Sequence, residues 1–261
     1  MTTVGGFRPA SDAANAALGA STAPNAAFAP PGRRPVRAAR TRLAFGGAVA
    51  LLAASNVVSN RLWPEGYVVW NLGMAGVLLL LARSCGLTWD DLGLAGHRLR
   101  RGLALGGVAV AAVGLIYAAG VAHPATRVAF VDERGAVPLA AVLFAALVRI
   151  PLGTVLLEEL AFRGVLPALV GGGWWRATLV SSGLFGLWHV LPSMGMTNAA
   201  MGDLGTTATV AGAVLFTTAA GVVFRVGQRW SGHLATPMML HLATNSLGAL
   251  VAWWVVHHAH P

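Results

Sequence analysis

The stretch Leu-Leu-Glu-Glu-Leu-Ala-Phe-Arg-Gly, residues 156–164, places three ionisable side chains inside apolar sequence that continues on both sides. Charged groups at membrane depth are costly, so they are rare and usually functional. On a helix, Glu159 and Arg163 stand four residues apart with the acid first, which is the favoured order for an ion pair. Glu158 lies about 100° away from that line. We therefore expect Glu159 to hold Arg163 and Glu158 to be available for chemistry.

The apolar surroundings of this stretch extend over most of the chain. Of the 261 residues, 56% are hydrophobic and 10% are charged, and the mean hydropathy is +0.67. Soluble domains carry about 25% charged residues. The composition therefore excludes an ordinary soluble domain and predicts an all-α, polytopic transmembrane helical bundle in the cell membrane.

The net charge of +9 comes from 18 arginines and no lysine. In a soluble chain such basicity would indicate nucleic-acid binding. Here the arginines lie mostly in the N-terminal tail and in short loops, where they orient membrane spans. We expect membrane lipids as partners and no nucleic acid. Cys85 is the single cysteine, which excludes an internal disulfide and a cysteine-based metal cluster. The lysine-free, alanine- and glycine-rich composition suggests a bacterium with GC-rich DNA.

Residues 1–41 are predicted to form a disordered, basic, cytoplasmic tail, and residues 42–261 the membrane domain. The tail is rich in Ala, Pro, Ser and Thr and ends in a run of arginines, without the apolar core of a signal peptide. A basic tail just before the first span predicts a cytoplasmic N-terminus in contact with anionic lipid head groups.

About seven spans follow from the uncharged intervals, since about 20 residues cross the hydrocarbon. The arginine-rich loop at 83–101 and the basic connections near Arg176 and Arg225 are expected on the cytoplasmic side. An eighth span arises if the long fourth interval is divided or re-entrant, and the C-terminus then changes sides. The intervals are 43–60, 66–82, 103–123, 137–169, 176–194, 206–224 and 234–256.

Two later spans carry further polar pairs at helical spacing. Phe185 precedes His189 by four residues, and His241 precedes Asn245 by four, so each pair shares a helix face. Glutamate can accept a proton from water, histidine can assist, and neutral donors can stabilise an oxyanion. No serine lies in a Gly-x-Ser-x-Gly elbow, and Cys85 is far away in sequence. The set predicts a water-activating hydrolase.

Each residue also has a structural interpretation. A single histidine in a membrane helix is often an interhelical hydrogen-bonding group. Arg149 is expected to extend towards an interface, and Trp188 to line a cavity beside His189. The remaining loop histidines are expected to have no role in the site: His97, His123 and His233.

The ordered motifs Glu-Glu-x-x-x-Arg, Phe-x-x-x-His and His-x-x-x-Asn resemble those of the CPBP family of intramembrane proteases. This family includes type II CAAX prenyl endopeptidases and bacterial bacteriocin-processing or self-immunity proteins, also called Abi proteins. The resemblance covers residues 158–245, within a core of about 137–256. The stretch Trp-Asp-Asp-Leu-Gly-Leu, residues 89–94, is similar to a loop common upstream in such proteins.

The resemblance implies metal-independent, cofactor-free hydrolysis of peptide bonds in membrane-associated peptides or proteins, within a cavity open towards the cytoplasm. Glu158 would activate water with the assistance of His189, and His241 with Asn245 would form the oxyanion site. Three further residues would support the site: Glu159, Arg163 and Phe185.

Two other classes stay open at this stage. A zinc metalloprotease could use Glu158, His189 and His241 as ligands, although His-Glu-x-x-His is absent. A non-catalytic scaffold or immunity protein, or a transporter with a proton-relay glutamate, is the second class. The sequence does not name the substrate or the oligomeric state.

Overall fold

The computed structural model describes residues 38–131, 135–194 and 205–259. Within these ranges every regular element is a helix, which confirms the all-α prediction. Most of the predicted tail lies outside the described residues, but its last four positions form the first turn of helix α2. Helix α2 therefore begins at Ala38, and the first candidate membrane span at Arg40.

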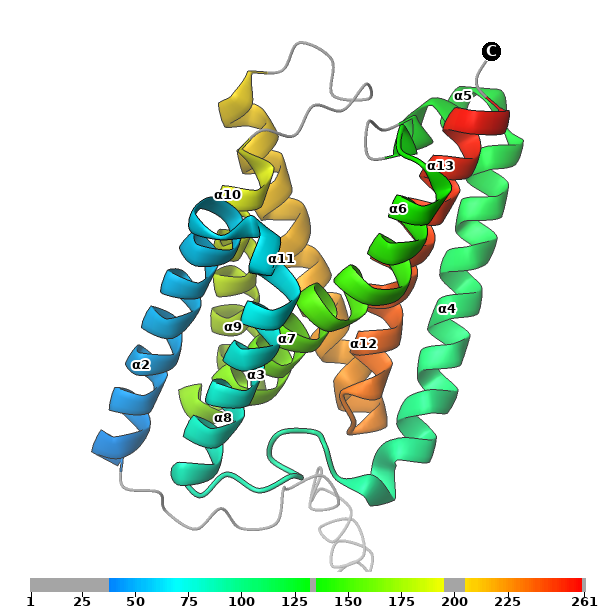
Figure 1. Ribbon diagram of the computed structural model, residues 1–261. Coiled ribbons are helices and arrows are strands. Elements are labelled where there is room, and N and C mark those ends of the chain that lie inside the picture. Colours follow the sequence, from blue (N-terminus) through cyan, green and yellow to red (C-terminus); the bar gives the residue numbers. More distant parts are fainter. Residues whose placement is uncertain (1–37, 132–134, 195–204, 260–261) are drawn as a thin grey trace, which may run out of the picture. The chain divides into compact units, whose positions relative to one another are not determined.

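The helices follow one another with short connections (Figure 1). Those before the predicted core are α2 (Ala38–Val57), η3 (Val58–Leu62), η4 (Pro64–Gly66), α3 (Tyr67–Ser84), η5 (Gly96–Arg98), α4 (Leu99–Ala122), α5 (Pro124–Arg127) and η6 (Val128–Phe130). Those of the core are α6 (Leu139–Phe144), η8 (Ala145–Val155), α7 (Leu156–Glu159), η9 (Leu160–Val165), α8 (Leu166–Val170), α9 (Trp174–Trp188), α10 (Val190–Ser193), α11 (Thr206–Ser231), α12 (Ala235–Leu242), η11 (Ala243–Leu247) and α13 (Gly248–His258).

Six helices of the described chain are long and apolar enough to cross a membrane. They coincide with six of the seven predicted intervals, and the protein is therefore a multi-pass membrane protein. The remaining interval, 176–194, corresponds to α9, which has 15 residues, and the short α10. At 1.5 Å per residue, α9 spans only about 22 Å. Helix α9 ends at Trp188, just before His189, whereas the predicted interval continued to residue 194.

The fourth interval forms a continuous helical run of 32 residues, Leu139–Val170, so the predicted alternative of a divided segment is not observed. Pro151 lies inside this run and cannot donate a backbone hydrogen bond. The helix responds by widening into the π-helical segment η8, and a second π-helical segment, η9, follows the glutamates. Figure 1 shows the run crossing obliquely from α6 to α8, as a helix longer than the bilayer requires.

Helices α4 and α12 pack closely through small residues. Gly102 and Gly106 of α4 face α12 and the turn before it. A Cβ added at Gly102 would lie 2.9 Å from the Cβ of His233 and 3.2 Å from that of Ala235, and one added at Gly106 would lie 2.5 Å from the Sδ of Met239. The Thr236 hydroxyl donates to the carbonyl of Gly102 at 2.9 Å. This Gly-x-x-x-Gly spacing allows two backbones to approach in a membrane, and it holds α12 against α4.

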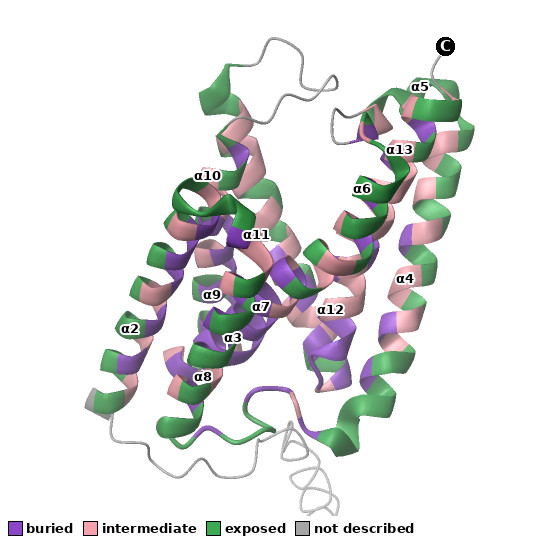
Figure 2. Cartoon of the chain, in the orientation of Figure 1, coloured by how far each residue is buried: buried purple, intermediate pink, exposed green. Residues whose placement is uncertain are grey.

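The N-terminal helices form one wall of the core. Buried residues of α2 and α3, among them Leu52 and Leu78, pack with Leu157 and Phe185 in one hydrophobic cluster. Figure 2 shows buried residues on the inner faces of α2, α3 and α9, and exposed ones facing outward. The loop at 89–94 joins this cluster through Leu92, and the carbonyl of Gly93 accepts a hydrogen bond from the Leu234 amide at 2.7 Å.

The arginine-rich connections gather at one end of the described helices. The first turn of α2, the loop between α3 and α4, the α8–α9 turn and the α11–α12 turn all lie there (Figure 1). The last turn of α13 lies at the opposite end. The structure thus brings together the loops that the sequence grouped on one side of the membrane.

Candidate active site

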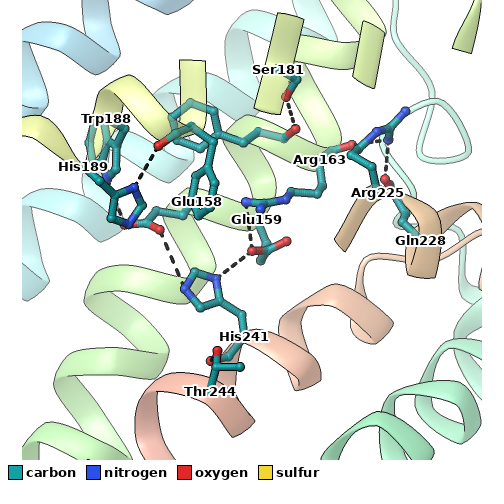
Figure 3. Close-up of polar contacts among 12 residues, drawn as sticks. Glu158, Glu159, Arg163, Ser181, Trp188, His189, Arg225, Gln228, His241 and Thr244 are labelled. Atoms are coloured by element: carbon teal, nitrogen blue, oxygen red, sulfur yellow. Dashed lines mark hydrogen bonds and ion pairs between the residues drawn. The ribbon is translucent and has the colours of Figure 1, made fainter. Parts of the chain in front are cut away.

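The two glutamates occupy consecutive positions of the short segment α7, and both are withdrawn from solvent. Glu158 is 3% exposed, Glu159 0% and Arg163 1%. Nη1 of Arg163 lies 3.1 Å from Oε1 of Glu159, so the ion pair predicted from the four-residue spacing is present (Figure 3). The contact between Arg163 and Glu159 is an ion pair, but its geometry is not that of a hydrogen bond. It supplies the counter-charge that a buried carboxylate needs.

Two phenylalanine rings enclose the buried guanidinium. The Cζ atom of Arg163 lies 3.9 Å from the ring centroid of Phe185 and 4.7 Å from that of Phe224. Stacking of this kind stabilises a desolvated cation. The ring of Phe224 also lies 5.3 Å from the ring of His241. Phe224 therefore contacts both Arg163 and His241. No sequence motif pointed to Phe224.

His241 reaches the two glutamates from α12. Its Nδ1 lies 2.7 Å from Oε1 of Glu159, and its Nε2 lies 3.8 Å from Oε2 of Glu158 (Figure 3). An ionised carboxylate only accepts hydrogen bonds, so Nδ1 donates to Glu159. Sequence reasoning paired Glu159 with Arg163 alone. The structure makes Glu159 a partner of the cation and of the histidine together.

Glu158 is held on one side by an indole. The Nε1–H of Trp188 donates to Oε1 of Glu158 at 2.9 Å, while Oε2 is buried without a hydrogen-bond partner among the described residues. Trp188 is the last residue of α9 and is 7% exposed. Sequence analysis expected it to line a cavity and missed the hydrogen bond, because only its adjacency to His189 pointed to the site.

His189 lies where α9 ends. Its backbone N–H donates to the carbonyl of Gly186, which leaves the carbonyl of Phe185 for its own Nδ1 at 2.8 Å. A carbonyl only accepts, so Nδ1 carries the proton and Nε2 of the neutral ring is basic. The rings of Phe185 and His189 are 4.7 Å apart, and the ring of His241 is 6.1 Å from Phe185. Phe185 thus packs against both histidines, but no direct hydrogen bond joins His189 to Glu158 in the described structure.

Asn245 lies one turn beyond His241, in the π-helical segment η11. Its side chain is half-buried and forms no hydrogen bond with any other described residue. A π-helix needs more residues per turn than an α-helix. Because η11 is π-helical, the four-residue spacing no longer places His241 and Asn245 directly above one another on the same helix face. Tyr117 of α4 supports this turn by donating to the carbonyl of Thr244 at 3.0 Å.

The residues proposed as zinc ligands are engaged in other contacts. Nδ1 of His189 binds a backbone carbonyl, and Nδ1 of His241 binds Glu159. Within residues 38–131, 135–194 and 205–259, no group of three His, Cys, Asp or Glu side chains is arranged to hold a metal ion. The polar cluster is therefore organised around carboxylate–histidine and carboxylate–indole contacts.

Residues 140–247 match the family model described as type II CAAX prenyl endopeptidase Rce1-like. Over this segment, the chain is similar to the Rce1-like CAAX proteases. The Rce1-like segment runs from α6 to the end of η11 and contains all seven residues selected from the sequence. Helices α2, α3 and α4 lie outside it. No curated protein and no solved structure gives a significant match to the chain.

Proposed function

We propose that this protein is an intramembrane endopeptidase that hydrolyses peptide bonds of membrane-associated peptides or proteins by glutamate-activated water. The observation that supports this best is the asymmetric environment of Glu158. Oε1 accepts the indole hydrogen bond, whereas Oε2 faces Nε2 of His241 at a distance too long for a direct hydrogen bond. One oxygen is held in place, and the other has no hydrogen-bond partner among the described residues; we propose that this oxygen binds the reacting water.

In the proposed reaction, a water bound at Oε2 of Glu158 loses a proton to the carboxylate as its oxygen attacks the scissile carbonyl. The carbonyl oxygen becomes an oxyanion, and the proton then passes from Glu158 to the leaving amine. Nε2 of His189 is a basic atom that can assist this transfer, since Nδ1 is committed to the Phe185 carbonyl.

We assign the oxyanion site to His241 and Asn245. The Glu159 carboxylate holds Nδ1 of His241 at 2.7 Å, so its Nε2 faces Glu158, and an N–H at this atom would donate to the oxyanion. The amide of Asn245 supplies a second, neutral donor. Glu159 holds both Arg163 and His241 in place.

The substrate proposal is a segment of a membrane-associated peptide or protein. The matched family is named for endopeptidases that act on CAAX prenyl proteins. Nothing in the site requires a prenyl group for the hydrolytic step itself. We therefore propose peptide hydrolysis as the activity, with lipidated and unlipidated segments as alternative substrates.

Glu158→Gln tests this function directly. Membranes from cells carrying wild type or Glu158→Gln are compared by mass spectrometry of new peptide termini. Glu65→Gln is the matched control, because Glu65 is exposed at the start of the η4–α3 helix and away from the site. We expect a set of termini that appears with wild type and Glu65→Gln and is lost with Glu158→Gln. Identical termini in all three membranes would favour a scaffold or a transporter.

Chelation separates the glutamate mechanism from the zinc mechanism. The amide of Asn245 is a good oxyanion donor but a poor zinc ligand, and the histidines already have other partners. We expect purified enzyme to retain its activity with chelator and to contain no stoichiometric metal by elemental analysis. Activity that is lost with chelator and restored by zinc supports the metalloprotease alternative instead.

A further inference from the structure

A buried asparagine of α2 contacts the end of α9. Nδ2 of Asn56 donates to the carbonyl of Trp188 at 2.9 Å, and Asn56 is 7% exposed. The two residues are far apart in sequence, and Asn56 lies outside the segment that matches the family model. The contact is therefore a connection between the N-terminal helices and the site that the family motifs do not include.

The Trp188 carbonyl needs a partner because of a proline. In an α-helix, this carbonyl would accept from the backbone N–H of residue 192. Residue 192 is Pro192, which has no N–H. The helix also breaks at His189, whose amide donates to Gly186 instead. A buried carbonyl without a partner is costly, and the Asn56 amide satisfies it from a neighbouring helix.

The orientation of the Asn56 amide is determined by both of its contacts. A carbonyl can only accept, so the NH₂ group of Asn56 must face Trp188. Its Oδ1 accepts a hydrogen bond from Nδ2 of Asn60 at 2.7 Å. Asn60, one turn further along, thereby stabilises the orientation in which Asn56 donates to the carbonyl.

The same tryptophan holds the proposed base. The Trp188 indole donates to Oε1 of Glu158, and His189 is the next residue in the chain. We propose that Asn56 is a positioning residue: by anchoring the Trp188 backbone, it fixes the indole that orients Glu158 and the point at which His189 leaves α9. This role rests on the proposed function of Glu158. Asn56 does not touch the reacting atoms.

A second amide supports the same arrangement from α3. Nδ2 of Asn71 donates to the carbonyl of Gly153 at 2.7 Å, five residues before Glu158 on the same helical run. Asn71 is 1% exposed, and its Oδ1 faces the hydroxyl of Ser55 at 3.5 Å. The α2–α3 pair thus contacts both helices that carry the Glu158–Trp188 hydrogen bond.

The test uses full-length protein in lipid nanodiscs and a readout that does not depend on turnover. The indole ¹H–¹⁵N resonance of Trp188 is assigned by its loss in Trp188→Phe. In wild type it reports the hydrogen bond from the indole to Oε1 of Glu158, and it should shift in Glu158→Gln. In Asn56→Ala, and in the volume-conserving Asn56→Leu, the resonance should shift and broaden. Val57→Ala is the control, because Val57 follows Asn56 in α2 but is 42% exposed and has no hydrogen-bonding side chain.

Rescue by Pro192→Ala distinguishes this role from general packing. The new backbone N–H at residue 192 can satisfy the Trp188 carbonyl, so the Asn56→Ala/Pro192→Ala protein should recover the wild-type resonance.

Turnover is measured on the peptide whose cleavage the terminus comparison identifies. Displacing a catalytic group by about 1 Å costs up to about 100-fold in rate, so we expect Asn56→Ala to lower kcat about tenfold with KM little changed. The kcat of the Asn56→Ala/Pro192→Ala protein should return to within about threefold of the wild-type value.

The outcomes separate the two proposals. An unchanged Trp188 resonance in both Asn56 variants overturns the positioning role, as does a double variant that fails to recover. A changed resonance with wild-type turnover also overturns it, provided that Glu158→Gln is inactive. Equal turnover in wild type and Glu158→Gln overturns the proposed function itself, whatever the resonance shows.

Discussion

The adjacent glutamates differ in their partners. Glu159 is fully buried and contacts both Arg163 and His241, whereas Glu158 accepts one indole hydrogen bond and keeps its second oxygen free of direct hydrogen bonds in the described structure. Helical phase predicted this division for Arg163. It did not predict His241, which comes from a helix more than 80 positions later in the chain.

We predict that Glu158→Gln and Glu159→Gln affect different properties of the protein. Glu158→Gln should lower turnover about 10²–10⁴-fold, the range of a lost general base, with little change in thermal stability, because the amide oxygen can still accept from Trp188. Glu159→Gln should destabilise the fold by about 3–5 kcal/mol, since it leaves Arg163 buried without its counter-charge. Thermal unfolding in detergent and terminus release measure the two effects. Equal stability and equal loss of activity in both variants contradict the assignment.

At the scale of elements, the start of α12 depends on a neutral histidine. The Nδ1 atom of His233 accepts from the backbone N–H of Ala235 at 2.9 Å, and the backbone N–H of His233 donates to the Ser231 hydroxyl at 3.1 Å. Burial lowers the pKa of the His233 imidazole below its usual 6.5, and protonation would turn the accepting Nδ1 into a donor. His233 was expected to have no role, but it caps the helix that carries His241.

This cap predicts a pH-dependent stability. Above pH 6.5 the imidazole is neutral in the folded and unfolded chains, and the stabilisation is fully present. As the pH falls below 6.5, the unfolded chain binds the proton first, so stability decreases until the folded pKa is reached. His233→Asn, whose amide oxygen can accept from the same N–H, should flatten this decline. Amide hydrogen exchange of α12 between pH 8 and 5.5 is the measurement, and an identical decline in the variant rejects the cap as its cause.

The contact between α4 and α12 offers a matched pair of glycines. A Cβ at Gly102 would lie 2.9 Å from the Cβ of His233, an atom close to the backbone, whereas a Cβ at Gly107 meets nothing within 4 Å. We predict that Gly102→Ala destabilises the protein by about 1–3 kcal/mol through overpacking. Gly107→Ala should be neutral or stabilising by up to about 1 kcal/mol through helix propensity. Thermal unfolding of both variants compares them, and equal melting temperatures would show that α4 and α12 do not pack this closely.

At the scale of the whole membrane domain, the arginine-rich connections share one end of the helices (Figure 1). Glu158 lies nearer to the Val170 end of its helix than to the Leu139 end, and the α8–α9 turn belongs to the basic end. Arginine-rich loops stay in the cytoplasm. The proposed site is therefore expected to receive its substrate from the cytoplasm or from the inner leaflet.

Cysteine labelling checks this orientation in intact cells after Cys85 is replaced by serine. Gly173 is exposed in the α8–α9 turn with open space around its Cα, and Ala125 is exposed at the opposite end. A membrane-impermeant thiol reagent added outside should label Ala125→Cys and leave Gly173→Cys unlabelled until the membrane is opened. Gly164 is unsuitable because it is buried against the carbonyl of Leu92. The reverse labelling pattern contradicts the cytoplasmic-access prediction.

The sequence by itself determined the class of fold, six of the spans and the Glu159–Arg163 pair, because hydrophobicity and helical spacing are local properties. Three ordered motifs in the sequence also indicated a resemblance to CPBP proteases, and the family match over residues 140–247 supports that resemblance. The roles of Glu158, His189, His241 and Asn245 remain predictions for the experiments above.

Only the tertiary structure decided which distant groups meet. It placed His241 between the two glutamates, brought the Trp188 indole to Glu158, and joined Asn56 to the Trp188 carbonyl. Proline and π-helical turns shift the helical phase and leave carbonyls without backbone donors. Which side chain satisfies each carbonyl depends on how the helices pack against one another, and no local spacing in the sequence encodes that.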